Sequence, residues 1–175
     1  MLDILLYTSI FLGTVGAMEL VAWVTHKYVM HGLLWNLHKS HHAPYEGGFE
    51  KNDWFGIFFS AVSISLMILG LHLWFPLFFV GLGLVGYGAI YLFMHDILVH
   101  HRFGFRVVPR GGYLQRMYQA HRLHHAVAEK DGAVSFGFLI APSIAVLKEQ
   151  LRMNRARGAD VDEQTIETSH DWRAG

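Results

Sequence analysis

Two stretches of this chain, His38-Lys-Ser-His41-His42 and His121-Arg-Leu-His124-His125, share the pattern His-x-x-His-His. In an α-helix the residues i, i+3 and i+4 lie on one face, so each stretch can direct three imidazoles toward one point. A further pair of histidines precedes each stretch. Because histidine is the commonest metal ligand, we predict one dinuclear metal site. Its ten expected ligands are His26, His31, His38, His41, His42, His95, His100, His121, His124 and His125.

The two preceding pairs, His26 with His31 and His95 with His100, have a spacing of five residues. On an ideal α-helix, side chains five residues apart point about 140° away from each other. They can meet only at a helix end or across a π-bulge, which is common at functional sites. His101 is ambiguous, because it could replace His100 as a ligand or orient it.

The composition points toward a membrane. Hydrophobic residues make up 53% of the 175 residues and charged residues only 16%. The hydrophobic share is higher and the charged share lower than in typical soluble domains. The formal net charge is zero, so no global field attracts nucleic acid. The chain has no cysteine, which excludes thiolate-ligated haem, cysteine-ligated iron–sulfur clusters and cysteine-containing zinc fingers.

Three apolar segments, 2–24, 54–74 and 77–94, are long enough to cross a bilayer core of about 30 Å. The segment 133–147 is also apolar, but it is short and contains Pro142. That is more typical of a re-entrant or interfacial segment than of a span. We therefore expect an all-α integral membrane protein with three transmembrane helices, or four if this last segment also spans.

All fourteen lysines and arginines lie within 27–51 or 102–173. With three spans both basic regions fall on one side, which the positive-inside rule identifies as the cytoplasm. The same topology brings the four histidine groups to that side, as a cytoplasmic histidine-rich helical cap. A fourth span would place the basic residues of 148–157 outside, against the rule. We expect one membrane domain over 1–150 and a polar tail over 151–175, helical at first and then loosening into disorder.

The third apolar segment contains Gly81-x-Gly83-x-x-Gly86, which has the spacing of a dinucleotide-binding fingerprint. That fingerprint follows a strand and opens a helix, whereas these glycines lie within an apolar helix. Small residues let membrane helices pack closely, and we assign the glycines to that role.

Few carboxylates accompany the histidines. Glu19 lies seven residues before His26, on nearly the same helical face, where it is either a functional acid or a carboxylate near the membrane interface. Asp53 and Asp96 could accept hydrogen bonds from ligand imidazoles, as Glu19 and His101 could, or simply cap helices.

The spacing alone does not choose the metal, since imidazole suits iron, copper, zinc and nickel. A dinuclear histidine site beside apolar helices suggests oxygen activation on a lipid-like substrate. A histidine-rich metal-binding or metal-transport protein is the alternative of another class, but transport would favour polar ligands along the spans. A bis-histidine cytochrome would need single histidines facing each other. The outlying His72 and His170 are expected to be ordinary polar residues.

Several runs resemble the bacterial β-carotene hydroxylases of the membrane fatty-acid-hydroxylase superfamily. They are His26-Lys-Tyr-Val-Met-His31-Gly, His38-Lys-Ser-His41-His42, His95-Asp-x-x-x-His100, Pro109-Arg-Gly-Gly-Tyr113, Ala120-His-Arg-Leu-His-His125-Ala and Ser135-Phe-Gly-Phe. The histidine spacing marks the superfamily, and the last three runs point to the carotenoid branch. The match covers roughly 18–142.

The resemblance implies a non-haem di-iron monooxygenase that hydroxylates the 3 and 3′ positions of β-carotene, giving zeaxanthin by way of β-cryptoxanthin. It implies two iron ions held by the ten histidines, O2 as co-substrate, and electrons from reduced ferredoxin and its reductase. It places the enzyme in the bacterial inner membrane, where lipid surrounds it. The nearest rivals are other membrane di-iron oxygenases, namely a carotenoid ketolase or a fatty acyl or sterol hydroxylase or desaturase.

Residues 102–122 contain five arginines and no acid. These arginines either steer an acidic ferredoxin to the cap or simply follow the positive-inside rule. They are Arg102, Arg106, Arg110, Arg116 and Arg122.

Overall fold

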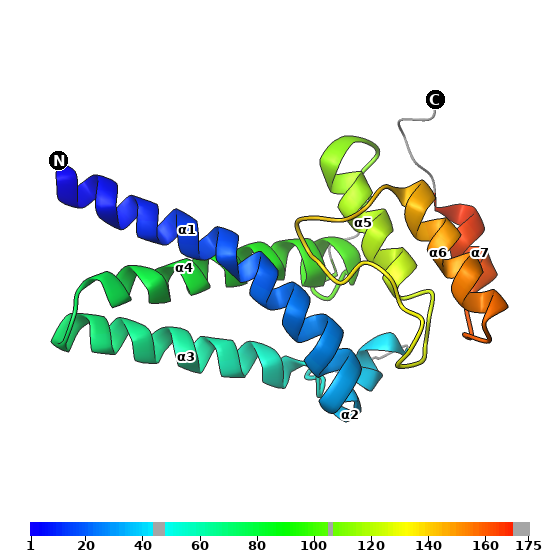
Figure 1. Ribbon diagram of the computed structural model, residues 1–175, viewed down its shortest axis with the longest axis horizontal. Helices are drawn as coiled ribbons and strands as arrows, with labels where there is room; N and C mark the ends of the chain where they lie inside the picture. Colours follow the sequence, from blue (N-terminus) through cyan, green and yellow to red (C-terminus); the bar gives the residue numbers. More distant parts are fainter. Residues whose placement is uncertain (44–47, 105–106, 170–175) are drawn as a thin grey trace.

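Three long helices carry a group of short helices at one end (Figure 1). This computed structural model describes residues 1–43, 48–104 and 107–169. Within those ranges all regular secondary structure is helical, apart from one isolated bridge between Val127 and Val161. The expected all-α class is therefore confirmed.

The long helices are α1 (Leu2–Val24), α3 (Asp53–His72) and α4 (Pro76–Tyr91). Helices α1 and α4 continue directly into the π-helices η1 (Thr25–Leu33) and η3 (Leu92–Val99). These three continuous helices, and no others in the described part of the chain, are long and apolar enough to cross a membrane. They match the three spans expected from the sequence, and most of their side chains are left for lipid to cover.

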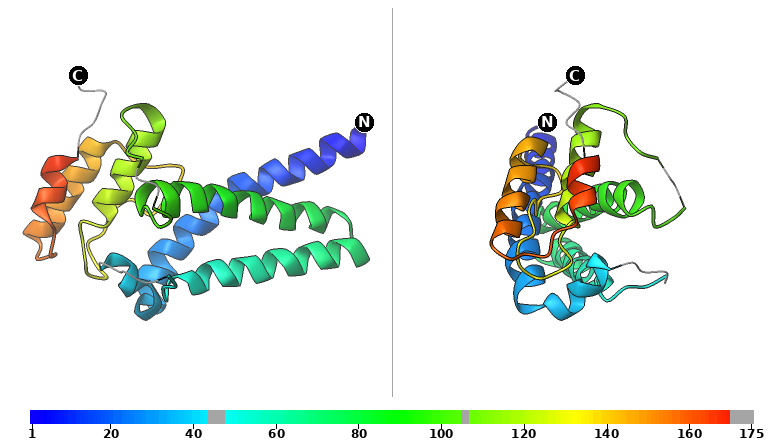
Figure 2. Two further views of the ribbon diagram at one scale, coloured as in Figure 1. Left: turned by 180° about the vertical axis from the view of Figure 1, so that it is seen from behind. Right: turned by 90° about the vertical axis from the view of Figure 1, so that its right-hand side faces the viewer.

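Helix α4 packs against both other spans, with α3 and α1 meeting different glycines (Figure 2). A Cβ added at Gly81 would lie 2.7 Å from the carbonyl oxygen of Ser63 on α3. One added at Gly83 would lie 2.6 Å from the Cβ of Thr14 on α1. Neither position can hold a larger residue without separating the helices, which confirms the packing role of this glycine motif.

The chain turns sharply at the end of η1. Gly32 leaves the helical dihedral angles (φ −124°, ψ −108°), and the chain folds back through α2 (Trp35–His38) and the 3-10 helix η2 (Lys39–His42). Helix α5 (Gly112–His124) follows η3 at the same end of the long helices. All four histidine groups therefore lie at one end of the bundle, as the topology requires.

The apolar segment 133–147 is not a fourth span. Residues 133–143 form no helix, and α6 (Ile144–Ala156) begins only after Pro142 and the capping Ser143, whose hydroxyl accepts from the N–H of Val146. The segment instead runs across the cap, where the buried carboxylate of Glu19 accepts hydrogen bonds from part of its backbone.

The segment after residue 150 is more ordered than the sequence suggested. Helix α6 continues to Ala156, and a further helix, α7 (Glu163–Thr168), packs on α5. Val161 and Ile166 are buried in the same apolar core as α5 and α6. The described tail therefore belongs to the cap as far as Ser169, and His170 and the residues after it lie outside the described part.

Candidate metal centre

The π-helices explain how histidines five residues apart come together. The N–H of His100 donates to the carbonyl of His95 at 3.0 Å in η3, and that of Leu34 to Val29 at 2.8 Å at the end of η1. These i to i+5 bonds define a π-helix, in which residues five apart stack on one face. The pairs therefore come together through π-helices, which is one of the two arrangements that their spacing left open.

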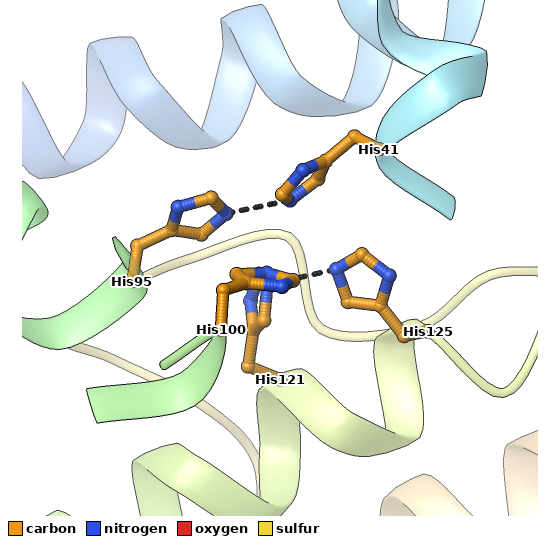
Figure 3. A group of neighbouring side chains, drawn as sticks. All are labelled: His41, His95, His100, His121 and His125. Atoms are coloured by element: carbon orange, nitrogen blue, oxygen red, sulfur yellow. Dashed lines mark hydrogen bonds between the residues drawn. The ribbon is translucent and has the colours of Figure 1, made fainter. Parts of the chain in front are cut away.

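The first cluster brings together five imidazoles from η2, η3 and α5 (Figure 3). The Nε2 atoms of His41 and His95 are 2.8 Å apart, and the Nε2 of His121 lies 3.2 Å from that of His100 and 3.0 Å from that of His125. Metal–nitrogen bonds of about 2.0–2.1 Å put the ligand atoms of one ion roughly 3–4 Å apart, so the spacing suits a shared ion. We call His41, His95, His100, His121 and His125 the first cluster.

The second cluster lies beside the first. Its Nε2 atoms are 3.2 Å apart between His26 and His38 and 3.2 Å apart between His31 and His124. The Nε2 of His42 lies 3.1 Å from that of His31 and 3.3 Å from that of His38, which adds a fifth ring. We call His26, His31, His38, His42 and His124 the second cluster.

Each His-x-x-His-His stretch serves both clusters, which corrects the expectation that it directs three imidazoles toward one point. His121 and His125 belong to the first cluster, whereas His124 belongs to the second. Relative to position i of a helix, i+4 lies about 40° to one side and i+3 about 60° to the other. The middle histidine of α5 therefore points away from its neighbours. His41 also joins the other cluster than His38 and His42, but it lies in the 3-10 helix η2, to which these α-helical angles do not apply.

Within the described part of the chain, seven of the ten rings also meet an oxygen through their other nitrogen, Nδ1. Four donate to backbone carbonyls at 2.8–2.9 Å, namely His42 to Val127, His31 to Lys130, His124 to Val134 and His26 to Phe136. Three meet side chains, namely His38 with Asn52 at 2.7 Å, His41 with Glu50 at 3.2 Å and His95 with Asp96 at 2.7 Å. An oxygen acceptor needs the proton on Nδ1, which leaves the Nε2 lone pair of a neutral ring facing the cluster.

This donor set fits a pair of metal ions. Lone pairs about 3 Å apart repel each other, and a cation between them removes the repulsion. Burial lowers the pKa of His38 to about 4 and that of His42 to about 3, and it lowers the pKa of His124 well below its ordinary value. The rings are therefore neutral at pH 7, which is the form that binds a metal.

Glu19 does not touch an imidazole; it holds a loop. Its Oε2 accepts from the Tyr87 hydroxyl at 2.7 Å, and its Oε1 accepts from the three consecutive N–H groups of 138–140 at 2.9–3.0 Å. Every contact is a donor, as an ionised carboxylate requires. The acid acts on the ligands only through this loop, because the loop includes the Phe136 carbonyl that accepts from His26.

The other predicted outer residues differ in what they contact. Asp96 lies against the ligand His95, whereas both oxygens of Asp53 bind Arg102, at 2.6 and 2.5 Å. His101 belongs to neither cluster; its backbone is left-handed (φ 52°), and its ring centroid lies 6.3 Å from that of Tyr118.

Sequence reasoning missed Glu50 and Asn52, the partners of His41 and His38. Both lie in the polar connection between the first His-x-x-His-His stretch and α3, and that position was the only available signal. The four carbonyl acceptors leave no signal at all, because any residue type can supply a backbone carbonyl.

The five arginines of 102–122 are not equivalent. The hydrogen bond to Asp53 raises the pKa of Arg102 above its usual range and ties its guanidinium within the chain. Arg116 and Arg122 lie over the rings of Tyr113 and Tyr118, 5.9 and 6.0 Å from the ring centroids. Arg110 is exposed, and Arg106 lies outside the described residues.

A small apolar cavity of about 10 Å³ opens beside the first cluster. Two of the ligand rings, His95 and His121, form part of its wall. The remaining wall comes from Met94, Val99, Met117, Gly137 and Phe138. The wall of the cavity is thus mainly apolar beside the two ligand imidazoles.

The chain is similar to known hydroxylases. The model of the fatty acid hydroxylase family matches residues 11–142. The beta-carotene hydroxylase of Pantoea ananas is 51% identical over 139 residues, which cover 79% of each chain. The beta-carotene hydroxylase of Paracoccus sp. (strain N81106 / MBIC 01143) is 46% identical over 158 residues, 89% of this chain and 97% of the relative. The chloroplastic beta-carotene 3-hydroxylase 1 of Arabidopsis thaliana is 37% identical over 134 residues, 74% of this chain and 43% of the relative. No solved structure was found to match.

Proposed function

This chain belongs to the fatty acid hydroxylase family, and we propose that it is a membrane-bound non-haem di-iron monooxygenase that converts β-carotene to zeaxanthin. The observation that carries this proposal is the pair of five-imidazole clusters at one end of three apolar helices. The substrate follows from the bacterial relatives, which are named beta-carotene hydroxylases and are about half identical over most of this chain.

Each turnover replaces a C–H bond at ring carbon 3 by C–OH. Substrate, O2, two electrons and two protons give the alcohol and one water, so the first turnover yields β-cryptoxanthin and the second zeaxanthin. Iron, which imidazole ligands suit, would supply the activation of O2. One ion would be held by His41, His95, His100, His121 and His125, and the other by His26, His31, His38, His42 and His124.

The protein itself positions the ring and excludes water. Phe138 stands between the clusters, with its ring parallel to that of His26 at 5.4 Å and at right angles to that of His95 at 5.5 Å. The cavity beside it has room for about one water-sized molecule, so a carotenoid ring requires its walls to move. Met94 and Met117 can do so, because methionine side chains are flexible and adapt to apolar partners.

A C40 hydrocarbon dissolves in the bilayer rather than in water, so we propose that it enters sideways between the spans. The cavity supports this route, because Met94 and Val99 lie on η3, the continuation of α4. The end ring would then reach the first cluster while the rest of the polyene stays in lipid.

We further propose that the clusters face the cytoplasm across the bacterial inner membrane. The basic residues support this orientation, since all of them fall in the two polar regions that carry the histidine groups or follow them. Reduced ferredoxin, recharged by its reductase, would deliver the electrons. Arg102 is tied to Asp53, so a docking face would depend on Arg110, together with Arg116 and Arg122 on α5.

The experiment is expression of the chain in a β-carotene-producing host, with pigment chromatography and metal analysis of the purified protein. We expect zeaxanthin, transient β-cryptoxanthin and two iron ions per chain. Canthaxanthin would indicate a ketolase, and unchanged β-carotene with two iron ions bound would indicate another lipid substrate. A fully active protein without a transition metal would overturn the mechanism.

A further inference from the structure

The inner ligand sets of the two clusters are matched. Each has a histidine pair from a π-helix, His95 with His100 or His26 with His31. Each has the outer pair of one His-x-x-His-His stretch and the middle histidine of the other. All ten rings meet their cluster through Nε2. Any chemical difference between the two positions must therefore come from outside the rings.

The outer hydrogen bonds do differ, and they divide cleanly. In the second cluster all five Nδ1 partners are neutral oxygens, four from backbone carbonyls and one from the Asn52 amide. In the first cluster two of the five rings have a described Nδ1 partner, and both partners are carboxylates, Glu50 for His41 and Asp96 for His95. A carboxylate that accepts from Nδ1–H raises the basicity of the imidazole, so that the ring donates more strongly to a metal.

A charged network holds both carboxylates behind the first cluster. The bidentate pair of Arg102 and Asp53 is at its centre. The second oxygen of Asp53 also accepts the N–H of Glu50 at 2.8 Å, which fixes the backbone that carries this acid. A guanidinium nitrogen of Arg102 lies 3.9 Å from Asp96. Asp53 and Asp96 thus lie beside one cation, and Asp53 also fixes the backbone of Glu50, so the acids outnumber the cation behind His41 and His95.

We propose that the two metal positions are inequivalent, and that Glu50 and Asp96 act through His41 and His95 to make the first cluster the stronger-donating and tighter-binding one. The inference rests on the proposed di-iron function. The first cluster is also the one that lies beside the cavity, because its ligands His95 and His121 form part of the cavity wall. The electron-rich position is therefore the one that an apolar substrate can approach. Glu50 and Asp96 are positioning residues, since each acts through an imidazole and neither lines the cavity itself.

The test is the release of Fe(II) to a chromophoric chelator from anaerobic purified protein loaded with two equivalents. Wild type should release iron in two phases, with the slow phase belonging to the first cluster. Glu50→Gln and Asp96→Asn keep an oxygen acceptor but remove the charge, and each should speed the slow phase alone by roughly 10–100-fold. The matched control is Asn52→Asp, which places a carboxylate behind His38 and should slow the fast phase.

Three results would overturn the inference: a single phase in wild type, an equal effect of Asp96→Asn on both phases, or no effect of either charge-removing variant. Circular dichroism of each variant separates a local effect from misfolding, and the two independent variants guard against the failure of one. Pigment analysis separates this inference from the proposed function. Two distinct iron phases in a protein that makes no zeaxanthin would sink the function and leave the inequivalence standing.

Discussion

Glu19 offers a sharp test of how a membrane-embedded acid supports this site. It accepts four hydrogen bonds, one from Tyr87 and three from the backbone of 138–140, and only 8% of its surface is exposed. Glu19→Ala leaves four donors without an acceptor, of which those of Tyr87 and Phe138 are buried and the other two are partly buried. At about 1–3 kcal/mol for each buried unsatisfied group, the loss is at least about 2 kcal/mol, a substantial part of a typical stability of about 5–15 kcal/mol.

Glu19→Gln should be milder. The amide oxygen can still accept from 138–140, and its NH2 can donate to the Tyr87 oxygen once the hydroxyl rotates. Only the charge is lost, which should cost about 1–2 kcal/mol, because hydrogen bonds to charged groups exceed neutral ones by about that amount. The alanine variant should also lose iron, since the freed loop carries the carbonyl that orients His26.

The assay is thermal unfolding in detergent, with iron content measured on the same samples. Leu20→Ala is the matched control, because Leu20 is the next residue of α1 and is 65% exposed. If Glu19→Ala melted no lower than the control and kept both irons, the loop-anchoring role would be refuted. If Glu19→Gln instead changed the iron spectrum without lowering the melting temperature, Glu19 would be acting on a ligand directly.

Three further predictions use the same preparations. His124→Ala should abolish hydroxylation and lower the amount of bound iron, while the protein still inserts into the membrane. The control His72→Ala, at the far end of α3, should retain full turnover. Normal turnover of His124→Ala would remove His124 from the ligand set. Gly81→Val should cost about 1–3 kcal/mol by overpacking the α3–α4 contact, whereas Gly88→Ala, with no atom within 4 Å of its added Cβ, should not; equal membrane accumulation and melting of the two would contradict this. Metal-free protein should lose stability as the pH falls from 6.5 through about 4. Burial keeps the pKa of His38 at about 4 in the folded state, so His38 takes up a proton in the unfolded chain at a higher pH than in the folded one. Melting temperatures that do not change over this pH range would contradict the prediction.

Much of the fold could be read from composition and spacing. The three apolar segments, the close-packed Gly81 and Gly83, and the placement of all histidine groups at one end follow from hydropathy, helix geometry and charge bias. These are local or additive properties, so a single sequence contains them. The sequence also favoured a segment at 133–147 that does not span, but it did not show what satisfies the backbone there, because the acceptor Glu19 lies more than a hundred residues away.

The ten imidazoles could be named from the sequence, but not their division between two clusters. Helix periodicity places i, i+3 and i+4 on one broad face, and only the direction of approach of a second helix decides whether that face meets one ion or straddles two. The partners behind the rings were harder still. Asp96 is adjacent to His95 and could be proposed, whereas the carbonyls of 127–136 act without regard to residue type.

The crossing of His41 and His124 ties the two halves of the site together. The first cluster takes four rings from 95–125 and one from the first stretch, and the second takes four from 26–42 and one from the second stretch. Neither half can complete a cluster alone, so binding of either ion requires that η1–η2 be docked against η3–α5. Metal-binding energy is then folding energy for the whole cap. An ion in the first cluster fixes His41, which lies between the second-cluster ligands His38 and His42 in the sequence. An ion in the second cluster likewise fixes His124, which lies between His121 and His125. The clusters should therefore assemble together, although their outer partners make them unequal.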